Sequence, residues 1–264
     1  MPGGGLLVGD RLSGVVRRFG ADGRPVSAAL AQVAVEGGGQ RGLLGLARDG
    51  RGDVYASWTA PSGRILVGRI LPKPTRIVWR GPPSAPLADG GHLEVAPSGD
   101  LLIGIGDLED RSQLKNPRAP NGKLLLLDPA GPPSQRPRVL SSGWNNPFAF
   151  TYTPNGQLWV ADNSPGEGGE RLARGDLDGR ATHITILPPG TAPSGIAAVS
   201  DTRLVVCGYV SHLLLPYRIT PSGTPARAGP PLARDCRLGV VRLAGGRLAY
   251  AQEHAIRIVR TASP

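Results

Sequence analysis

This chain has few lysines, few aromatic residues and little clustered positive charge, and this scarcity argues against nucleic acids as partners. Only three of the 30 basic residues are lysines, and aromatic residues make up 5% of the 264 positions. The formal net charge is +10, but the arginines are spread singly along the sequence instead of gathering beside aromatic residues. Because nucleic-acid surfaces combine clustered cations with stacking aromatic rings, we expect no nucleic-acid partner.

Cysteines and apolar leader segments are also few. Cys207 and Cys236 are the only two cysteines, so the sequence permits one disulfide and is equally consistent with two reduced, buried thiols. The N-terminus lacks the basic and apolar regions of a secretory signal, and no apolar run is long enough to span a membrane. As written, the chain is expected in the cytoplasm, unless an upstream start site encodes an export signal.

Long helical stripes are absent. The 39 glycines and 27 prolines form a quarter of the chain, and they interrupt every apolar stripe at helical spacing within about two turns. Hydrophobic residues nevertheless reach 40% and are evenly distributed, which is enough to build a core. The composition therefore predicts an all-β protein of many short strands, folded as one domain over residues 1–264.

A repeated strand pattern is the main positive feature. Similar apolar strands, each preceded by a polar turn, begin near Leu6, Val54, Leu101, Leu158, Leu204 and Leu248. Most of them are followed by a second apolar strand, such as RILVGRI or KLLLLD. A period of this size with several strands per unit is typical of β-propellers. We therefore predict a six-bladed β-propeller of about 44 residues per blade, whose functional site uses loops from several blades.

An acidic loop follows the fourth repeated strand. The strand is predicted over Gln157–Asp162, after the turn at Pro154–Gly156. A polar loop is predicted from the end of this strand, with Asp162, Asn163, Glu167 and Glu170. Carboxylates and amides among glycines and prolines cannot form a core. They form either a solvated edge or an oxygen-rich site for a cation such as calcium.

A glycine-rich segment, Gly37–Gly42, fits the dinucleotide-binding pattern GxGxxG. A Rossmann unit also needs a following helix, whereas the segment after Gly42 is broken after about six residues and leads into the strand VYASWT. The sequence therefore argues against nucleotide binding there.

Three segments together carry a family resemblance. They are QRGLLGLA from Gln40, DGGHL from Asp89 and GWNNP from Gly143, which leads into LWVADNSPGEGGE. In this order and context, the chain resembles the soluble PQQ-dependent sugar dehydrogenases, also called glucose/sorbosone or aldose sugar dehydrogenases. The resemblance extends over nearly the whole chain, and it implies a periplasmic or secreted protein that binds a small sugar or glycan.

The resemblance implies a mechanism and a set of ligands. In this family a histidine takes the proton of the sugar C1 hydroxyl while hydride passes to pyrroloquinoline quinone (PQQ), which cations and a calcium ion hold. The corresponding cofactor positions in this sequence are Gln40, Asn145, Asn146, His212 and Arg237, and the calcium positions are Pro165 and Glu170.

Several of these positions depart from the family pattern. Ala88 stands where the family has its catalytic histidine, and Asn145 stands where it has an arginine. His212 falls near the family's lysine position, and Arg237 matches an arginine pair only by a shift of one residue. The candidate replacements for the base are Asp89 and His92. Strict alternation along a strand puts the side chains of Ala88 and His92 on the same face, although strand rise places them more than about 10 Å apart.

Two functions therefore remain open from the sequence. One is a sugar dehydrogenase that uses a quinone and an altered base. The other is a propeller without catalytic activity that keeps the scaffold and binds a glycan, a polyanion or a protein partner.

Overall fold

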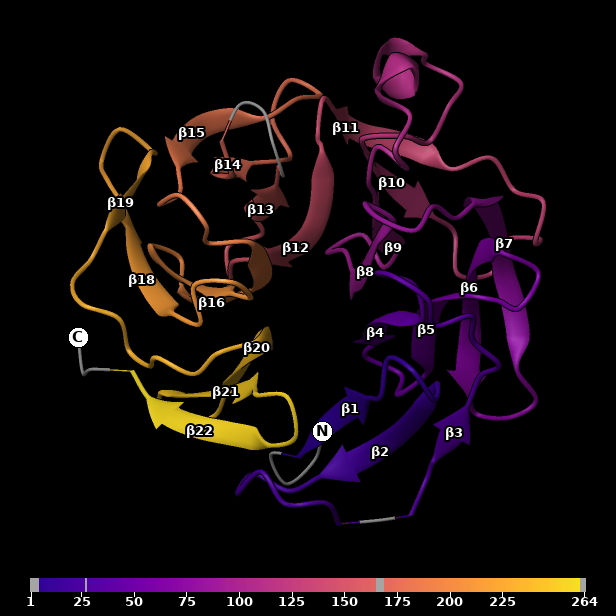
Figure 1. Ribbon diagram of the computed structural model, residues 1–264, viewed down its shortest axis with the longest axis horizontal. Coiled ribbons are helices and arrows are strands. Elements are labelled where there is room, and N and C mark those ends of the chain that lie inside the picture. The colour runs from indigo at the N-terminus through magenta and orange to yellow at the C-terminus, as the bar shows by residue number, and fades with distance from the viewer. Residues whose placement is uncertain (1–4, 27, 165–168, 262–264) are drawn as a thin grey trace. The chain divides into compact units, whose positions relative to one another are not determined.

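The protein is all-β, and its six sheets are the blades of a six-bladed β-propeller (Figure 1). The computed structural model describes residues 5–26, 28–164 and 169–261. The chain divides into two compact units. The first, here called the N-terminal unit, comprises Leu6–Phe19 and Pro25–Asn146, and the second, the C-terminal unit, comprises Met1–Gly5, Gly20–Arg24 and Pro147–Pro264. The expectation of a single domain over residues 1–264 stays a prediction.

The N-terminal unit holds three antiparallel sheets. The first has three strands, β1 (Leu6–Gly9), β2 (Val15–Phe19) and β3 (Ala31–Gln32). The second has four strands in sequence order, β4 (Leu43–Arg48), β5 (Val54–Thr59), β6 (Arg64–Leu71) and β7 (Arg76–Pro83). The third contains β8 (Gly90–Val95), β9 (Leu101–Ile105), β10 (Lys123–Leu127) and β11 (Arg138–Ser142). A single turn of 3-10 helix, η2 (Arg111–Lys115), lies in the long loop between β9 and β10.

The C-terminal unit also holds three antiparallel sheets. The first contains β12 (Asn146–Tyr152), whose first residue ends the N-terminal unit, β13 (Leu158–Asn163), β14 (Arg171–Arg174) and β15 (Thr182–Ile186). The next contains β16 (Pro193–Ser200), β17 (Arg203–Gly208), β18 (Leu214–Ile219) and β19 (Pro225–Arg227). The last has three strands, β20 (Leu238–Leu243), β21 (Arg247–Ala251) and β22 (Ile256–Arg260).

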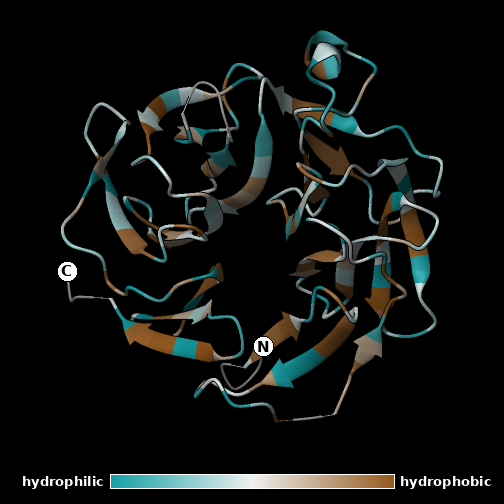
Figure 2. Cartoon of the chain, viewed as in Figure 1, coloured by the Kyte–Doolittle hydropathy of each residue, from teal (hydrophilic) through white to brown (hydrophobic). Residues whose placement is uncertain are grey.

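The predicted repeat is confirmed. The repeated motifs form β1, β5, β9, β13, β17 and β21, and the second apolar runs form β2, β6, β10, β18 and β22. Their hydrophobic character follows from their position: all five residues of β10, including four leucines, are buried, and the strand is almost wholly hydrophobic in Figure 2. A strand that packs on both faces reads as a continuous apolar run.

Each unit has its own core between stacked sheets. In the N-terminal unit, Trp79 and Val67 of the second sheet pack with Leu93 and Ile103 of the third. In the C-terminal unit, Trp159 of the fourth sheet packs with Leu204 and Tyr217 of the fifth. A single blade cannot bury its apolar faces, and stacking on a neighbouring blade buries them.

Gly42 directly precedes β4, a strand that the sequence argument did not predict, and no Rossmann helix follows it. No helix among the described residues is long and apolar enough to cross a membrane.

Candidate functional site

The loop between β7 and β8 brings together several of the predicted site residues. Ala88 is buried and has a φ of 56°, and Gly90 and Gly91, which begin β8, also have positive φ values. Close packing accompanies this backbone: a Cβ atom added to Gly106 would lie 2.0 Å from the carbonyl oxygen of Ala88. A Cβ atom added to Gly90 would likewise lie 2.4 Å from the carbonyl oxygen of Gly104, so glycines at positions 90 and 106 allow this close backbone approach.

Gln40 holds this loop from the turn before β4. Its side-chain Oε1 accepts a hydrogen bond from the backbone N–H of Ala88 at 2.8 Å, and its backbone N–H donates to the carbonyl of Pro86 at 2.8 Å. Its Nε2 group makes no hydrogen bond with any described residue. Gln40 thus fixes the loop with one side of its amide and leaves the other side as a donor.

Asp89 is a buried acid at the base of the same loop, with 1% of its surface exposed. Its carboxylate accepts the backbone N–H of Ala85 at 2.7 Å and the hydroxyl of Thr59 at 3.3 Å. Burial raises the pKa of Asp89 to about 6, against the opposing effect of these two hydrogen bonds and of the Arg41 guanidinium. Asp89 therefore combines a loop-holding contact with a pKa near neutrality.

The segment after β9 joins this loop to Asn145. The backbone N–H of Leu108 donates to the carbonyl of Ala88 at 3.2 Å, and that of Asp107 donates to the carbonyl of Asn145 at 2.7 Å. Asn146 follows as a buried residue at the start of β12. Gln40, Ala88, Asp89 and Asn145, separated by up to about a hundred positions in sequence, therefore belong to one hydrogen-bonded cluster in the N-terminal unit.

Arg111 adds a cation that the sequence argument missed. This exposed residue begins η2, and its Nη2 donates to the side-chain oxygen of Asn145 at 3.3 Å. A guanidinium thus lies beside the position where the resemblance implied a lost arginine. The only sequence signal was the cluster of polar residues in the loop that interrupts the third repeat, between β9 and β10.

His92 does not follow the alternation assumed from the sequence. The pairing of β8 with β9 runs from Gly90 with Ile105 to Leu93 with Ile103, so a bulge lies between Gly90 and Leu93. The positive φ of Ala88 also places that residue outside regular strand geometry. The argument that the side chains of Ala88 and His92 share a face is therefore wrong, and the role of His92 as a base stays a prediction.

The C-terminal unit holds the other predicted cofactor residues. The guanidinium of Arg237 lies over the ring of Tyr209, with 5.6 Å from its carbon to the ring centroid. The carbonyl of His212 accepts a hydrogen bond from the backbone N–H of Cys236 at 3.0 Å. This bond brings the backbone of His212 next to the residue that precedes Arg237. Tyr209 is exposed, which gives this part of the unit an aromatic surface beside a cation.

Cys207 and Cys236 form a disulfide, which resolves the question left open by the sequence. Both residues are fully buried, and their Cα atoms lie 5.8 Å apart. The bridge joins the end of β17 to the segment before β20 and encloses a sequence separation of 29 residues.

The predicted acidic loop needs one correction. Asp162 is not in a solvated loop: it pairs with Arg171 across β13 and β14, has no exposed surface, and accepts both Nε and Nη2 of Arg171 at 3.0 and 2.9 Å. The strand extends to Asn163 because this ion pair compensates the buried charge.

The resemblance assigns Glu170 to a calcium ion, but its carboxylate accepts a hydrogen bond from a backbone N–H group instead. Its Oε2 accepts the backbone N–H of Ala192 at 2.8 Å, and burial raises its pKa. Pro165 lies outside the described residues. Within the described ranges, no group of three or more histidine, cysteine or acidic residues is placed to hold a metal ion.

Comparison with known proteins decides the family. The sequence model of the glucose/sorbosone dehydrogenase family matches residues 1–174, about two thirds of the chain. The chain belongs to this family. The matched part includes Gln40, the Ala88 loop and Asn145, and it ends at β14, before His212 and Arg237.

Solved structures share the fold. The PQQ-bound form of aldose sugar dehydrogenase from Streptomyces coelicolor is 23% identical, with a TM-score of 0.79 over 98% of this chain and 91% of that one. The soluble aldose sugar dehydrogenase of Escherichia coli, in its apo form, is 19% identical, with a TM-score of 0.76 over 97% of this chain and 92% of that one. At these identities the likeness establishes the fold. No curated protein matches the chain.

Proposed function

We propose that this member of the glucose/sorbosone dehydrogenase family oxidises an aldose at its C1 hydroxyl in a PQQ-dependent reaction. The observation that carries the proposal is the hydrogen-bonded cluster of Gln40, Ala88, Asp89 and Asn145, which unites the family's motifs around an acid with a pKa near 6. A group with such a pKa is ionised at neutral pH and still accepts a proton readily.

The donor set of the cluster fits an anionic quinone. PQQ carries carboxylates, which need cations and hydrogen-bond donors. Arg111 supplies a guanidinium beside Asn145, and the Nε2 group of Gln40 is an unused donor. In the C-terminal unit, Arg237 and His212 are the residues that the resemblance assigns to the same cofactor. When bound, a quinone of this class would supply the two-electron acceptor for hydride.

Asp89 is the proposed proton acceptor in place of the histidine that Ala88 replaces. Its hydrogen bond from Thr59 is long, at 3.3 Å, so the oxygen that makes it is the one available for a substrate hydroxyl. The stronger bond to Ala85, at 2.7 Å, keeps the carboxylate oriented. Asp89 thus holds the loop with one oxygen and accepts the proton with the other.

Calcium does not fit the described residues, although the resemblance implies it. The Oε2 atom of Glu170 is engaged by Ala192, and Asp162 is engaged by Arg171. We therefore assign no role to calcium.

A second function is favoured by the burial of Asp89. With 1% exposure and a hydrogen bond to each oxygen, Asp89 also serves as a purely structural anchor of the loop. In that case the protein binds a glycan, a polyanion or a protein partner and does not turn over a sugar.

One experiment separates the two functions. Purified protein is supplied with PQQ, and the sugar-dependent reduction of a dye is measured for the wild type, Asp89→Asn and the control Asp201→Asn. Asparagine at 89 keeps an acceptor for Ala85 but cannot take the proton, so turnover should fall at least about a hundredfold while PQQ still binds. Asp201 caps the backbone N–H of Asn155 in the other unit, and its variant should keep full activity. PQQ binding without any turnover in the wild type would favour the second function.

The disulfide supports a proposal about location. Buried disulfides persist mainly in oxidising compartments. We propose that the mature protein is exported, in keeping with the family, and that Cys207–Cys236 forms after export. A free-thiol assay on protein isolated from its own cells would detect two thiols if the proposal is wrong.

A further inference from the structure

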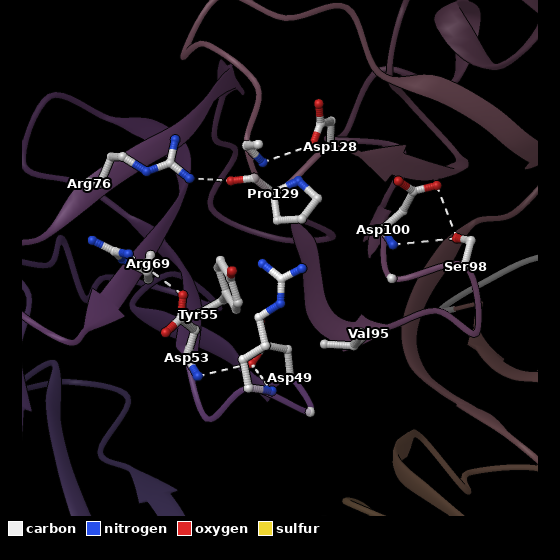
Figure 3. A pocket seen from close by; sticks show the side chains of 14 residues that line it. Asp49, Asp53, Tyr55, Arg69, Arg76, Val95, Ser98, Asp100, Asp128 and Pro129 are labelled. Atoms are coloured by element: carbon white, nitrogen blue, oxygen red, sulfur yellow. Dashed lines mark hydrogen bonds and ion pairs between the residues drawn. The ribbon is translucent and has the colours of Figure 1, made fainter.

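A second candidate site lies at the opposite ends of the strands that carry the Ala88 loop. β4 and β8 both begin beside that loop and end at an open pocket of about 670 Å³, within the N-terminal unit (Figure 3). The turns after β4, β8 and β10 line it. Its charged and polar lining includes Asp49, Asp53, Tyr55, Arg69, Arg76 and Asp128.

Tyr55 is the central feature of this pocket. The residue is 4% exposed and lies on β5, and in Figure 3 its side chain points into the space between the charged residues. Its hydroxyl makes no hydrogen bond with any described residue. The hydroxyl oxygen itself is open to the pocket, unlike the buried ring that carries it, so a ligand atom can reach it.

The carboxylates of the pocket are only partly used by the protein. Asp49 Oδ1 accepts the backbone N–H groups of Arg51 and Asp53 at 3.0 and 2.9 Å, and Asp128 Oδ1 accepts that of Ala130 at 2.8 Å. The other oxygen of each carboxylate has no hydrogen bond to a described residue. One oxygen atom of each of these two carboxylates therefore remains as an acceptor, in addition to the Tyr55 hydroxyl.

The arginines of the pocket are largely engaged. Arg76 donates to the carbonyls of Pro129 and Gly131, and Arg69 pairs with Asp53 at 3.6 Å. Arg51 is exposed on its turn. Four aspartates against three arginines give the lining a net charge of −1, in a protein whose formal charge is +10. Asp53 is paired with Arg69 and Asp100 with Arg138, at 3.5 Å, so it is the carboxylates of Asp49 and Asp128, which have no ion pair among the described residues, that disfavour an anionic ligand.

We propose that this pocket binds a small primary amine in its ammonium form. An ammonium group has three donors and no acceptor, which matches the free oxygens of Asp49 and Asp128 and the hydroxyl of Tyr55. One positive charge also neutralises the lining. The proposal is independent of the quinone and of the sugar, because it uses other residues at the other end of the strands.

Three probes of matched size test the proposal by NMR titration of the isotope-labelled protein. Butylammonium should shift the amide signals of Asp49 and its turn in a saturable way. Neutral butanol and anionic butyrate should leave these signals in place. Equal binding of butanol, stronger binding of butyrate, or no saturable shift with butylammonium would overturn the proposal.

Two substitutions locate the site. Asp49→Asn keeps an oxygen for the turn and removes the charge, and Tyr55→Phe removes only the hydroxyl, so each should weaken butylammonium binding by roughly tenfold without loss of the fold. The matched control is Asp22→Asn, because Asp22 also caps its own turn, by accepting the backbone N–H of Arg24 at 3.1 Å, and lies in the other unit. Unchanged binding in both variants, with folding verified by an unaltered unfolding midpoint, would contradict the assignment.

Discussion

The side-chain oxygen of Gln40 accepts the backbone N–H of Ala88 at 2.8 Å, and so ties the turn before β4 to the loop before β8. This contact joins the first of the three segments that carry the family resemblance to the residue immediately before the second. It makes Gln40 a support of the loop as well as a candidate ligand of the cofactor.

Gln40→Ala should therefore free the loop. The loss of one hydrogen bond costs about 1 kcal/mol, and the effect should be local because Gln40 is exposed. Hydrogen exchange at the Ala88 amide should become several-fold faster. Gln32→Ala is the control, because the Gln32 side chain also donates to a backbone carbonyl, that of Ser13 at 3.1 Å, without touching the loop. Equal exchange at Ala88 in the Gln40 variant and the wild type would contradict this role.

Asp89 should make stability depend on pH in an unusual direction. Its pKa is raised from 3.8 to about 6 on folding, so the folded state binds the proton more tightly than the unfolded state. Its contribution is fully present below about pH 3.8 and is lost as the pH rises through about 6, a change of about 3 kcal/mol. Urea unfolding of wild type and Asp89→Asn between pH 4 and pH 7 measures the difference. If the free-energy difference between the two proteins does not change across this range, Asp89 has an ordinary pKa.

Lys123 should stabilise the long loop between β9 and β10. This lysine is 3% exposed, and its Nζ donates to the carbonyls of Asn116, Ala119 and Asn121 at 3.0, 2.5 and 3.2 Å. Burial lowers its pKa. Lys123→Met leaves three carbonyls without their donor, which should cost about 1–3 kcal/mol. Limited proteolysis should then cut within residues 107–122, whereas Lys115→Met, at an exposed position of the same loop, should leave the cutting rate unchanged.

The Cys207–Cys236 bridge should stabilise the C-terminal unit. Closing a loop of this length restricts the unfolded chain, and the expected contribution is about 3–4 kcal/mol. The double variant Cys207→Ser/Cys236→Ser should unfold at a lower urea concentration than the oxidised wild type. Because both cysteines are fully buried, a reductant can reach the disulfide only in unfolded protein. Wild-type protein that has been reduced in this way should have the same midpoint as the double variant. Equal midpoints for the variant and the oxidised protein would mean that the bridge contributes nothing.

The sequence predicted the repeats well because the pattern of apolar strand and polar turn is local. Strands such as β5 and β10 begin within a residue of their predicted positions. Asp162 was predicted in a solvated loop because its partner, Arg171, lies on the next strand. An acidic residue in the sequence does not show whether it is solvated in a loop or buried in a strand beside a counterion from another strand. Arg111 was missed for a similar reason, since its proximity to Asn145 depends on how the loop after β9 folds back.

The bulge at His92 shows a further limit. Alternation along a strand predicts a shared face only while the pairing register is regular, and the positive φ values of Ala88, Gly90 and Gly91 break it. The glycines of DGG indicated an unusual backbone conformation, but they did not specify the direction of the chain or the position of the bulge.

The absorbance titration of the purified protein with PQQ tests the central claim most directly. We predict a saturable spectral shift at one PQQ per chain, weakened about tenfold or more in Arg111→Met, since a guanidinium that pairs with a carboxylate is lost. Arg118→Met, at an exposed position of the same loop, should bind as the wild type does. The absence of any saturable shift in the wild type would contradict the proposal that this chain uses the quinone of its family.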